Sequence, residues 1–476
     1  MKKKLAGLEQ RKRQWHASVA NCRGSRWSGP SAFRKVQQRM LVQRIPAGAS
    51  ILHVGCGRGD LLAALNPKRA AGVEPSAKLA AQARQRHTEL EIIESSLEAF
   101  RVQGHFDYIL VDDVLLDCFD VDDLLYCIKK AAHWDTRILI TNVSKLWRPI
   151  LKLLCFLGLA KTRFGDTWFS PEDLRSALAR NSFEVISASP EVLLPVDIPV
   201  LSTLANRIFA RLPGFRAFCL HHVLIARING QPQPAQEKPS VSVVVPARNE
   251  SGNIPRLMKE IPKMGRWTEV IFVEGNSTDD TYAVLEKAVK ERGDPKVRLI
   301  KQRGKGKGDA VRAGFAQAKG DILMILDADL TVPAETLPKF YNVVASGHTD
   351  FANGTRLVYG MDDRAMQFLN LLANHFFAHA FTFVLGQPIR DTLCGTKVLR
   401  RQLYEKIVAN RSYFGDFDPF GDFDLLFGAA RLHAKITDVP VRYFERVYGT
   451  TNISRFRHGL LLFSMLWIAA RRLKFQ

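Results

Sequence analysis

The sequence has no closely paired cysteines, although it contains seven cysteine residues. Their wide scatter excludes a disulfide framework and a cysteine-based zinc site, both of which need regular close spacings. The distribution favours reduced thiols in a reducing compartment such as the cytosol. The seven are Cys22, Cys56, Cys118, Cys127, Cys155, Cys219 and Cys394.

Long apolar runs are also missing, so no segment predicts a membrane-spanning helix. The nearest, 365–389, has no formal charge but carries Asn, Gln and His side chains and is interrupted by Gly386 and Pro388. The apolar run 459–470 is too short to cross, yet basic residues flank it on both sides. This pattern favours an amphipathic helix at an anionic membrane surface, with a buried terminal helix as the alternative.

Acidic residues are scarce: 47 Asp and Glu stand against 68 Lys and Arg, a net charge of +21. In the first 49 residues Glu9 is the only acid, and no apolar core follows as a signal peptide would require. We therefore expect residues 1–48 to form a partly disordered basic arm. The charge implies an anionic partner, which could be nucleic acid, membrane lipid or phosphorylated substrate. No zinc-finger or RNA-binding motif accompanies it, so we expect no nucleic-acid partner.

A short stretch near the middle of the second half carries the strongest chemical signal. The apolar run 322–326 predicts a buried strand, and it ends abruptly in Asp327-Ala328-Asp329. In an open α/β sheet, ligands bind beyond the carboxyl ends of the strands. Two carboxylates there suit Mg²⁺ or Mn²⁺ bridged to a nucleotide diphosphate. The alternative is a solvated turn, in which Asp is common.

In the first half, the strand 51–54 is followed by three alternating glycines, Gly55, Gly57 and Gly59. Closely spaced glycines let a ligand approach the backbone at a helix N-terminus. A second predicted strand ends in Glu74, the position from which an acid binds ribose hydroxyls. The pair predicts a Rossmann-like nucleoside site.

Residues 49–228 resemble the class I S-adenosylmethionine-dependent methyltransferases through HVGCGRGDLL, VEPS and FDYILVDDVLLDCFD. One departure is His53, where that family usually has an acid. The resemblance implies an S-adenosylmethionine site, or a retained fold without activity. It implies that the three glycines contact the methionine moiety, Glu74 the ribose, Ser96 and Leu97 the adenine, and Asp113 the reacting methyl group.

The stretch 145–160 is apolar with spaced basic residues. It indicates a second membrane-surface contact, a lid over the methyl acceptor, or ordinary core packing. The following proline-rich segment 229–240 has no apolar periodicity and predicts a domain linker.

Beyond the linker, polar motifs end three further predicted strands. They are VVVPARNE, EGNSTDDT and KGKGDAVRAGF, and DADL is the fourth motif in the series. The glycine and lysine loop suits a phosphate but does not fit the Walker pattern.

With these four motifs in order, residues 241–476 resemble glycosyltransferase family 2, whose members have the inverting GT-A fold. The resemblance implies that a UDP- or GDP-sugar is bound by Pro246, Ala247, Asn249, Glu250, Glu274, Ser277, Lys305, Lys307, Asp327, Ala328, Asp329 and Arg356. Later motifs (NGTR, DTLCGTK and FERVYGTTN) are similar to dolichyl- and polyprenyl-phosphate sugar synthases. The QxxRW signature of polymerising members is absent, which favours addition of a single sugar.

The roles of the candidate catalytic residues follow from charge. Asp327 and Asp329 would hold the metal, and Arg356 and Arg446 would bind phosphate oxygens unless they are solvated surface residues. A lipid phosphate needs no strong general base, whereas a hydroxyl acceptor does. Asp422 or Asp424 would serve for a hydroxyl, unless they cap a helix.

The sequence thus predicts an α/β protein with two Rossmann-like domains and C-terminal interfacial helices. We expect a peripheral hexosyltransferase on the cytoplasmic face of the membrane, acting on polyprenyl phosphate and fused to a methyltransferase. Two alternatives stay open: a glycosyltransferase for a hydroxyl acceptor whose methyltransferase-like domain is not catalytic, and a membrane-associated scaffold without turnover. The sequence leaves the oligomeric state open.

Overall fold

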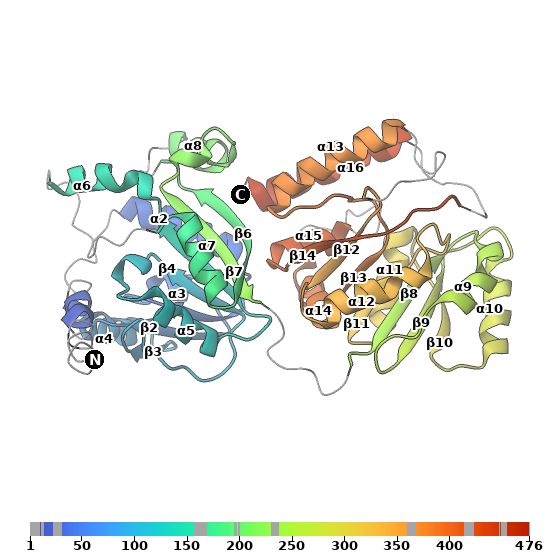
Figure 1. Cartoon of the computed structure of the whole chain (residues 1–476), viewed down its shortest axis with the longest axis horizontal. Coiled ribbons are helices and arrows are strands. Elements are labelled where there is room, and N and C mark those ends of the chain that lie inside the picture. The colour runs from blue at the N-terminus through green and yellow to red at the C-terminus, as the bar shows by residue number, and fades with distance from the viewer. Residues whose placement is uncertain are drawn as a thin grey trace. The chain divides into compact units, whose positions relative to one another are not determined.

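A computed structural model gives the structure of the chain. It describes residues 10, 14–21, 31–156, 169–194, 198, 200–229, 238–358, 368–413, 423–446, 448 and 455–475. The chain divides into two compact units, 1–232 with 475–476 and 233–474 (Figure 1). The division falls within the predicted linker, of which residues 230–237 lie outside the described part.

The first unit is built on a seven-stranded sheet of order β3-β2-β1-β4-β5-β7-β6. The first five strands of this order are parallel, and β7 runs antiparallel to both β5 and β6. The strands are β1 (Ser50–Val54), β2 (Arg69–Glu74), β3 (Glu91–Glu94), β4 (Tyr108–Asp112), β5 (Arg137–Val143), β6 (Phe183–Glu191) and β7 (His221–Ile228). β1 and β5 are buried along their whole length, as expected of strands covered on both faces.

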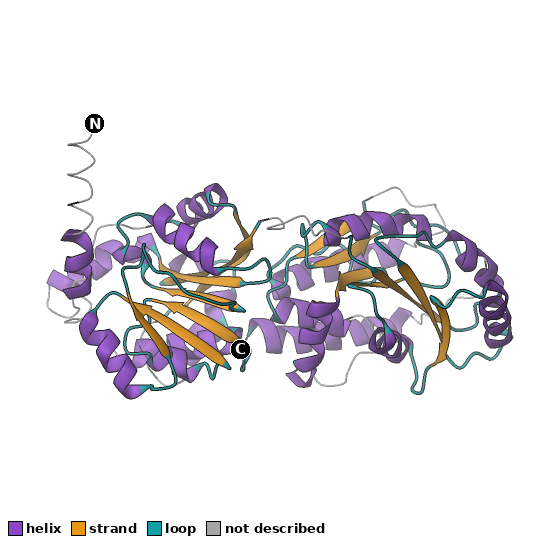
Figure 2. Ribbon diagram, turned by 90° about the horizontal axis from the view of Figure 1, so that it is seen from below, coloured by secondary structure: helices purple, strands orange, loops and turns teal. Residues whose placement is uncertain are grey.

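Helices connect these strands, and local capping residues start two of them (Figure 2). Asp120 accepts a hydrogen bond from the backbone of Asp122 at the start of α5, and Ser170 with Asp173 forms a capping box on α7. The helices are α2 (Ser31–Arg44), α3 (Asp60–Ala64), α4 (Ala77–Arg86), α5 (Val121–Ala131), α6 (Arg148–Phe156), α7 (Pro171–Arg180) and α8 (Leu201–Arg207).

The basic arm contributes structure to the first unit. Residues 14–21 are helical, and α2 follows them. Met40, Leu41 and Ile45 are buried in a hydrophobic cluster with β1 and β2. Part of the predicted basic arm is therefore ordered, because Met40 and Leu41 of α2, with Ile45 directly after it, contribute to this cluster.

The second unit has its own seven-stranded sheet, of order β10-β9-β8-β11-β13-β12-β14. β10, β9, β8 and β11 are parallel, whereas β13 is antiparallel to both of its neighbours, β11 and β12. The strands are β8 (Val241–Ala247), β9 (Thr268–Glu274), β10 (Val297–Lys301), β11 (Ile322–Ile325), β12 (Phe351–Thr355), β13 (Lys397–Arg400) and β14 (Ile436–Pro440).

Two hydrophobic clusters cover the two faces of this sheet, since alternate residues of β8 and β11 belong to opposite clusters. Helix α11 packs closely enough that a Cβ on Gly314 would lie 2.4 Å from Val244 Cγ1. The helices are α9 (Ile254–Glu260), α10 (Thr281–Arg292), α11 (Lys307–Gln317), α12 (Leu337–Ala345), α13 (Phe368–Leu385), α14 (Arg401–Ala409), α15 (Phe423–Arg431) and α16 (Arg455–Ala469).

The C-terminal helix α16 packs along α13, and the two lie side by side in Figure 1. Leu462, Met465 and Ala469 are buried in the core, whereas Leu460 and Trp467 are each 70% exposed. The sequence left two alternatives for this helix, a buried terminal helix and an interfacial one. The structure has features of both, because one side of α16 packs in the core and the other exposes apolar side chains to solvent. Among the described helices, none has the length and apolarity that a membrane crossing requires.

The prediction of an α/β protein with two Rossmann-like units is confirmed. Each unit carries its own parallel-dominated sheet and its own hydrophobic clusters. In both, the carboxyl ends of the central strands form an edge from which polar loops emerge.

Candidate functional sites

The loops after β8 and β9 are tied together at the carboxyl edge of the second sheet. The backbone N–H of Gly275 donates to the carbonyl of Ala247 at 2.9 Å. Asn249, with a positive φ of 58°, accepts from the backbone N–H of Thr278 at 2.8 Å. Its own N–H donates to Ser277 Oγ at 3.1 Å. The first two sequence motifs therefore form one connected rim.

Asp327 lies where β11 ends, beside the N-terminus of α11. Its Oδ1 is 2.6 Å from Lys307 Nζ. On its other side Gly395 makes room, because a Cβ there would lie 2.0 Å from Asp327 Oδ2. Burial alone would raise the pKa of Asp327, but the charge and hydrogen bond of Lys307, together with the charges of Lys397 and Arg356, lower this pKa below its ordinary value. Asp327 is therefore held as a carboxylate.

Asp329, two residues on, is held by the C-terminal part of the chain. Its Oδ1 accepts from Thr331 Oγ1 at 2.9 Å, and its Oδ2 accepts from Arg446 Nη2 at 2.6 Å. Arg446 Nη1 also donates to Glu250 Oε1 at 3.2 Å. One guanidinium thus joins the acidic pair to the loop after β8.

The segment around Arg446 packs against the same loop. The Phe444 N–H donates to the carbonyl of Thr331 at 2.9 Å, and the Tyr448 hydroxyl lies 2.9 Å from Ser251 Oγ. Glu250 is buried below this contact and accepts from Asn253 Nδ2 at 2.7 Å. Burial raises the pKa of Glu250 above its ordinary value, and the hydrogen bond from Asn253 offsets only part of this.

Asp327 and Asp329 match the ligand preference of a hard divalent cation in type and position. Both carboxylates are half-buried at one strand end, and each is balanced here by one basic side chain. The residues therefore fit Mg²⁺ or Mn²⁺.

Arg356 was expected to contact the donor, and its main partner is Asp391. Nε and Nη2 donate to the two carboxylate oxygens at 2.7 and 2.9 Å, a bidentate pair. Its guanidinium also lies 5.0 Å from the centre of the Tyr443 ring. Burial would raise the pKa of Asp391, but Arg356 outweighs it and lowers this pKa. Arg356 is not a solvated surface residue.

The remaining donor candidates lie along the same rim. Glu274 ends β9 and accepts from the Ser277 N–H at 2.6 Å; Lys305 is exposed in the loop before α11. Pro246 and Ala247 end β8, and Ala328 is buried between the two acids.

The structure describes one of the two candidate general bases, Asp424, and not the other, Asp422. Asp422 lies outside the described residues. Asp424 lies in the first turn of α15, where its Oδ2 accepts from Arg411 Nε at 2.8 Å. This acid is engaged in an ion pair that joins α15 to the 3-10 turn after α14.

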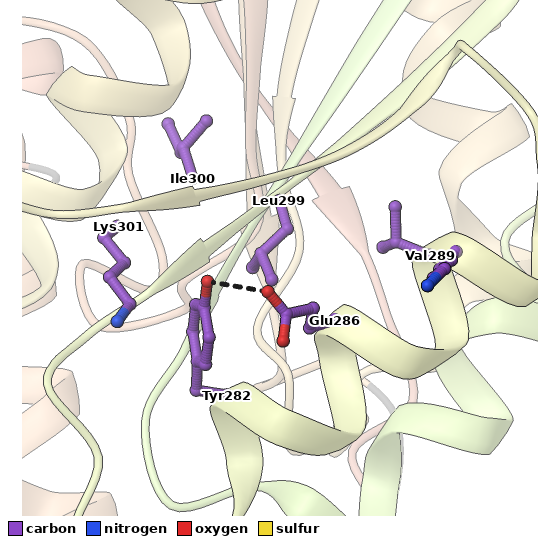
Figure 3. Close-up of a pocket in the computed structure, with 7 residues that line it drawn as sticks. Tyr282, Glu286, Val289, Leu299, Ile300 and Lys301 are labelled. Atoms are coloured by element: carbon purple, nitrogen blue, oxygen red, sulfur yellow. Dashed lines mark hydrogen bonds between the residues drawn. The ribbon is translucent and has the colours of Figure 1, made fainter.

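A hollow of about 260 Å³ lies between α10 and β10. In Figure 3, Tyr282 and Glu286 project from the helix, and the Tyr282 hydroxyl donates to Glu286 Oε1 at 3.2 Å. Lys301 Nζ lies 3.8 Å from the centre of the Tyr282 ring. This hollow lies at the outer strand of the sheet and contains none of the predicted site residues.

The glycine loop of the first unit has the backbone that only glycine adopts freely. Gly55, Gly57 and Gly59 have φ of 79°, 59° and 80°. Glu74 is fully buried, and its carboxylate accepts from the N–H groups of Gly57 and Ser76 at 2.9 and 3.0 Å. In this structure Glu74 braces the loop from the end of the neighbouring strand.

Asp113 lies beyond β4 in a network at the same edge. It has a positive φ of 54°, and its N–H donates to Thr141 Oγ1 at 2.9 Å. Gln37 of α2 donates to Asp113 Oδ2 at 3.1 Å, and His221 Nε2 lies 3.3 Å from the same oxygen. Of the adenine candidates, Ser96 is half-buried and Leu97 belongs to the core.

One group with three metal-ligand side chains occurs among the described residues. His105 Nε2 and His133 Nδ1 lie 3.1 and 2.8 Å from Asp135 Oδ1. The group precedes β4 and β5, at the amino ends of the strands, and so lies away from the glycine loop.

Several site residues were missed by sequence reasoning. Gly395 and Asp391 lie in the quoted DTLCGTK motif but received no role of their own. Gln37 comes from a segment with no motif. The signal available for Gly395 was its place between polar residues of that motif, whereas the sequence around Gln37 offered no such signal.

Comparison with known proteins finds two family matches. Residues 242–408 match the model of glycosyl transferase family 2, and residues 29–188 match a methyltransferase domain. The second match begins before residue 49 and includes α2.

Curated relatives resemble the second half of the chain. An undecaprenyl-phosphate 4-deoxy-4-formamido-L-arabinose transferase of Pseudomonas aeruginosa is 29% identical over 230 residues, which are 48% of this chain and 64% of that protein. Glycosyltransferase AglJ of Haloferax volcanii is 28% identical over 234 residues, 49% of this chain and 72% of that protein. The chain thus spans less than two thirds of the first relative's length.

A solved structure, glucosyl-3-phosphoglycerate synthase from Mycobacterium tuberculosis with Mn²⁺, UDP and product, aligns with a TM-score of 0.37. It is 20% identical, covering 49% of this chain and 80% of that one.

Proposed function

The chain carries a glycosyl transferase family 2 domain and a methyltransferase domain, and from this premise we propose that it moves one sugar from a nucleotide-sugar donor to a polyprenyl phosphate. The observation that carries the proposal is the balanced acidic pair, Asp327 with Lys307 and Asp329 with Arg446, at the strand edge where donors bind. The name of the Pseudomonas aeruginosa relative supports the acceptor class.

The reaction is a displacement at the anomeric carbon with an oxocarbenium-like transition state. A divalent cation on Asp327 and Asp329 would neutralise the charge that gathers on the departing diphosphate. Lys305 in the exposed loop before α11 would meet the outer phosphate oxygens. Arg446 would keep the acidic pair aligned with the loop after β8.

The ion pair between Asp424 and Arg411 supports an acceptor that is already anionic. A carboxylate that accepts from a guanidinium is a poor general base, because protonation would break the pair. A lipid phosphate carries its own negative charge and needs no such base. Asp424, the one of the two candidate bases that the structure describes, is therefore engaged in the ion pair with Arg411.

The protein would work peripherally on an anionic membrane surface, on its cytoplasmic face where nucleotide sugars are made available. The apolar side chains that α16 exposes, with basic residues Arg471 and Arg472 directly after it, support this location.

The first unit would bind S-adenosylmethionine at the loop of Gly55, Gly57 and Gly59 and transfer its methyl group.

Transfer of radiolabelled sugar tests the leading proposal. Purified protein would be incubated with a panel of UDP- and GDP-sugars, with polyprenyl phosphate or the matched polyprenol as acceptor. We expect label in the organic phase with the phosphate alone, and loss of transfer on chelation of divalent cations or in Asp327→Asn. Equal labelling of the polyprenol, or label confined to a water-soluble hydroxyl acceptor, would overturn the lipid-phosphate assignment.

A further inference from the structure

The first unit exposes an unusual amount of apolar surface on two insertions, residues 144–156 and residues 198 and 200–220, which we name the apolar cap. Six of its large apolar side chains are more than half exposed. They are Leu146 (55%), Leu153 (56%), Phe156 (88%), Val200 (70%), Leu201 (53%) and Phe218 (58%). The surface of a soluble protein rarely carries so many exposed large apolar side chains close together, and such a patch usually indicates a binding surface.

The cap is held firmly on the sheet. The Ser144 N–H donates to the carbonyl of Leu220 at 2.7 Å, and Trp147 Nε1 donates to the carbonyl of Phe218 at 2.9 Å. Arg211, which is 9% exposed, pairs with the buried Glu191 at 2.8 Å. These contacts hold the beginning of the first insertion against the end of the second, and they attach the second insertion to the end of β6.

Strand register places the cap at the carboxyl edge of the sheet. His221, the first residue of β7, is paired with Val143 at the end of β5 and with Glu191 at the end of β6. Both insertions therefore leave the sheet beside the loop after β4. His221 itself contacts Asp113 of that loop, so the cap borders the predicted cofactor site.

The charge of the cap has one sign. Its described residues include Lys145, Arg148, Arg207 and Arg216, and none of them is an acid. Apolar side chains interspersed with basic ones are complementary to a bilayer with anionic headgroups: the former enter the acyl boundary and the latter stay at the phosphates. A protein partner of ordinary surface composition would not require this one-sided charge.

We propose that the apolar cap is a lipid-binding face that seats the methyltransferase unit on an anionic bilayer surface. It is distinct from the α16 face of the second unit. Seated in this way, the carboxyl edge of the first sheet lies at the level of the headgroups.

Sedimentation of the full chain with vesicles tests the proposal. Vesicles of phosphatidylcholine with phosphatidylglycerol would be compared with vesicles of phosphatidylcholine alone, in a Trp467→Glu background that weakens any contribution from α16. We expect the cap double variant Leu153→Glu/Phe156→Glu to bind the anionic vesicles at least about tenfold more weakly than its parent, since two large side chains lose their burial.

Tyr126→Glu is the matched control, because Tyr126 is 56% exposed on α5, outside the cap. It should bind vesicles like its parent. Circular dichroism would verify folding, which exposed positions rarely perturb. Unchanged sedimentation of the cap variant, or the same loss in Tyr126→Glu, would overturn the proposal. So would a cap variant that alters only the protein's mass in light scattering without lipid, since that outcome identifies a second protein copy as the occupant.

Discussion

Charges at the carboxyl edge of the second sheet occur in compensating pairs. Lys307 balances Asp327, Arg446 balances Asp329, and Arg356 balances Asp391. The pair of Arg356 and Asp391 is the most buried of the three, and removing one member of a buried pair leaves the other uncompensated, which costs far more than the pair contributes. Stability and activity should therefore be sensitive to single substitutions at this edge, including positions such as Asp391 to which the sequence motifs gave no role.

Gly395→Ala should reduce sugar transfer with little effect on folding. The new Cβ would lie 2.0 Å from Asp327 Oδ2 and 2.4 Å from Lys307 Nζ, so the ion pair must move. A displacement of about 1 Å at a reacting site can cost about 100-fold, and we expect a loss of this order in kcat/KM. Steady-state transfer assays would measure it.

The matched control is Gly293→Ala at the C-terminus of α10. Nothing lies within 4 Å of its Cβ, but its φ of 58° disfavours alanine. This variant should lose about 1 kcal/mol of stability and keep its transfer rate. Parallel losses of rate and stability in both variants would contradict a specific role for Gly395.

Asp391→Asn should destabilise the fold in a pH-dependent manner. Its removal leaves Arg356 buried without its bidentate partner, at a cost of about 3–5 kcal/mol near neutral pH. Because the folded-state pKa of Asp391 lies below its ordinary value of 3.8, its contribution is complete above 3.8 and is lost as pH falls through the folded-state value.

Urea unfolding of wild type and Asp391→Asn at decreasing pH measures this difference. The gap in unfolding free energy should narrow below pH 3.8. A gap that is constant across this range would show that the carboxylate charge is not what stabilises the pair.

The sequence predicted the acids and lysines of the second site because both groups lie in polar segments that follow apolar strands, the acids after β11 and the lysines after β10. It could not provide their partners. Whether Arg446 would meet Asp329 or a ligand depends on how the segment after β14 returns over β8, which no local pattern specifies. The same holds for Arg356, which was expected at the donor and is bound by Asp391.

At the level of elements, α11 is the helix on which the second site depends. It begins at Lys307 and packs on β8 and β9, where Gly314 permits close approach. The strand ends of this unit were predictable from apolar runs that stop at polar clusters. Helix α2 was not, because only a few apolar side chains separate an ordered basic helix from a disordered arm.

Gly314→Ala should lift α11 from the sheet. Its Cβ would lie 2.4 Å from Val244 Cγ1 and 3.2 Å from Val273 Cγ2. Overpacking costs about 1–3 kcal/mol, and the better helix propensity of alanine recovers up to about 1 kcal/mol. We expect net destabilisation together with slower transfer, because Lys307 moves with the helix.

Thermal unfolding and transfer assays would measure both effects. Ala316→Ser, on the exposed side of the same helix, is the control and should change stability by about 0.5 kcal/mol or less. If Gly314→Ala were as stable as wild type, the close packing of α11 on β8 would not be a constraint.

At the level of the whole molecule, the two sheets have separate cores and separate candidate sites. Asp329→Ala should therefore abolish sugar transfer and leave S-adenosylmethionine binding intact. Gly57→Val should do the reverse, because its φ of 59° and its bond to Glu74 leave no room for a branched residue.

Titration calorimetry and radiolabelled transfer on the same preparations would test this independence. Loss of both activities in either variant would indicate that the units are coupled. The composition of the linker was enough to predict two units, whereas the residues that form each unit's hydrophobic clusters are evident only from the structure.

The contact of Arg446 with Asp329 and Glu250 also sets an order of events during synthesis. The strands β8 to β11 and both acids emerge from the ribosome early, whereas their guanidinium partner follows more than 100 residues later. A nascent chain that ends before Arg446 carries the acidic pair without this counter-charge. The acidic pair is therefore complete with both of its basic partners only after nearly the whole chain has been made.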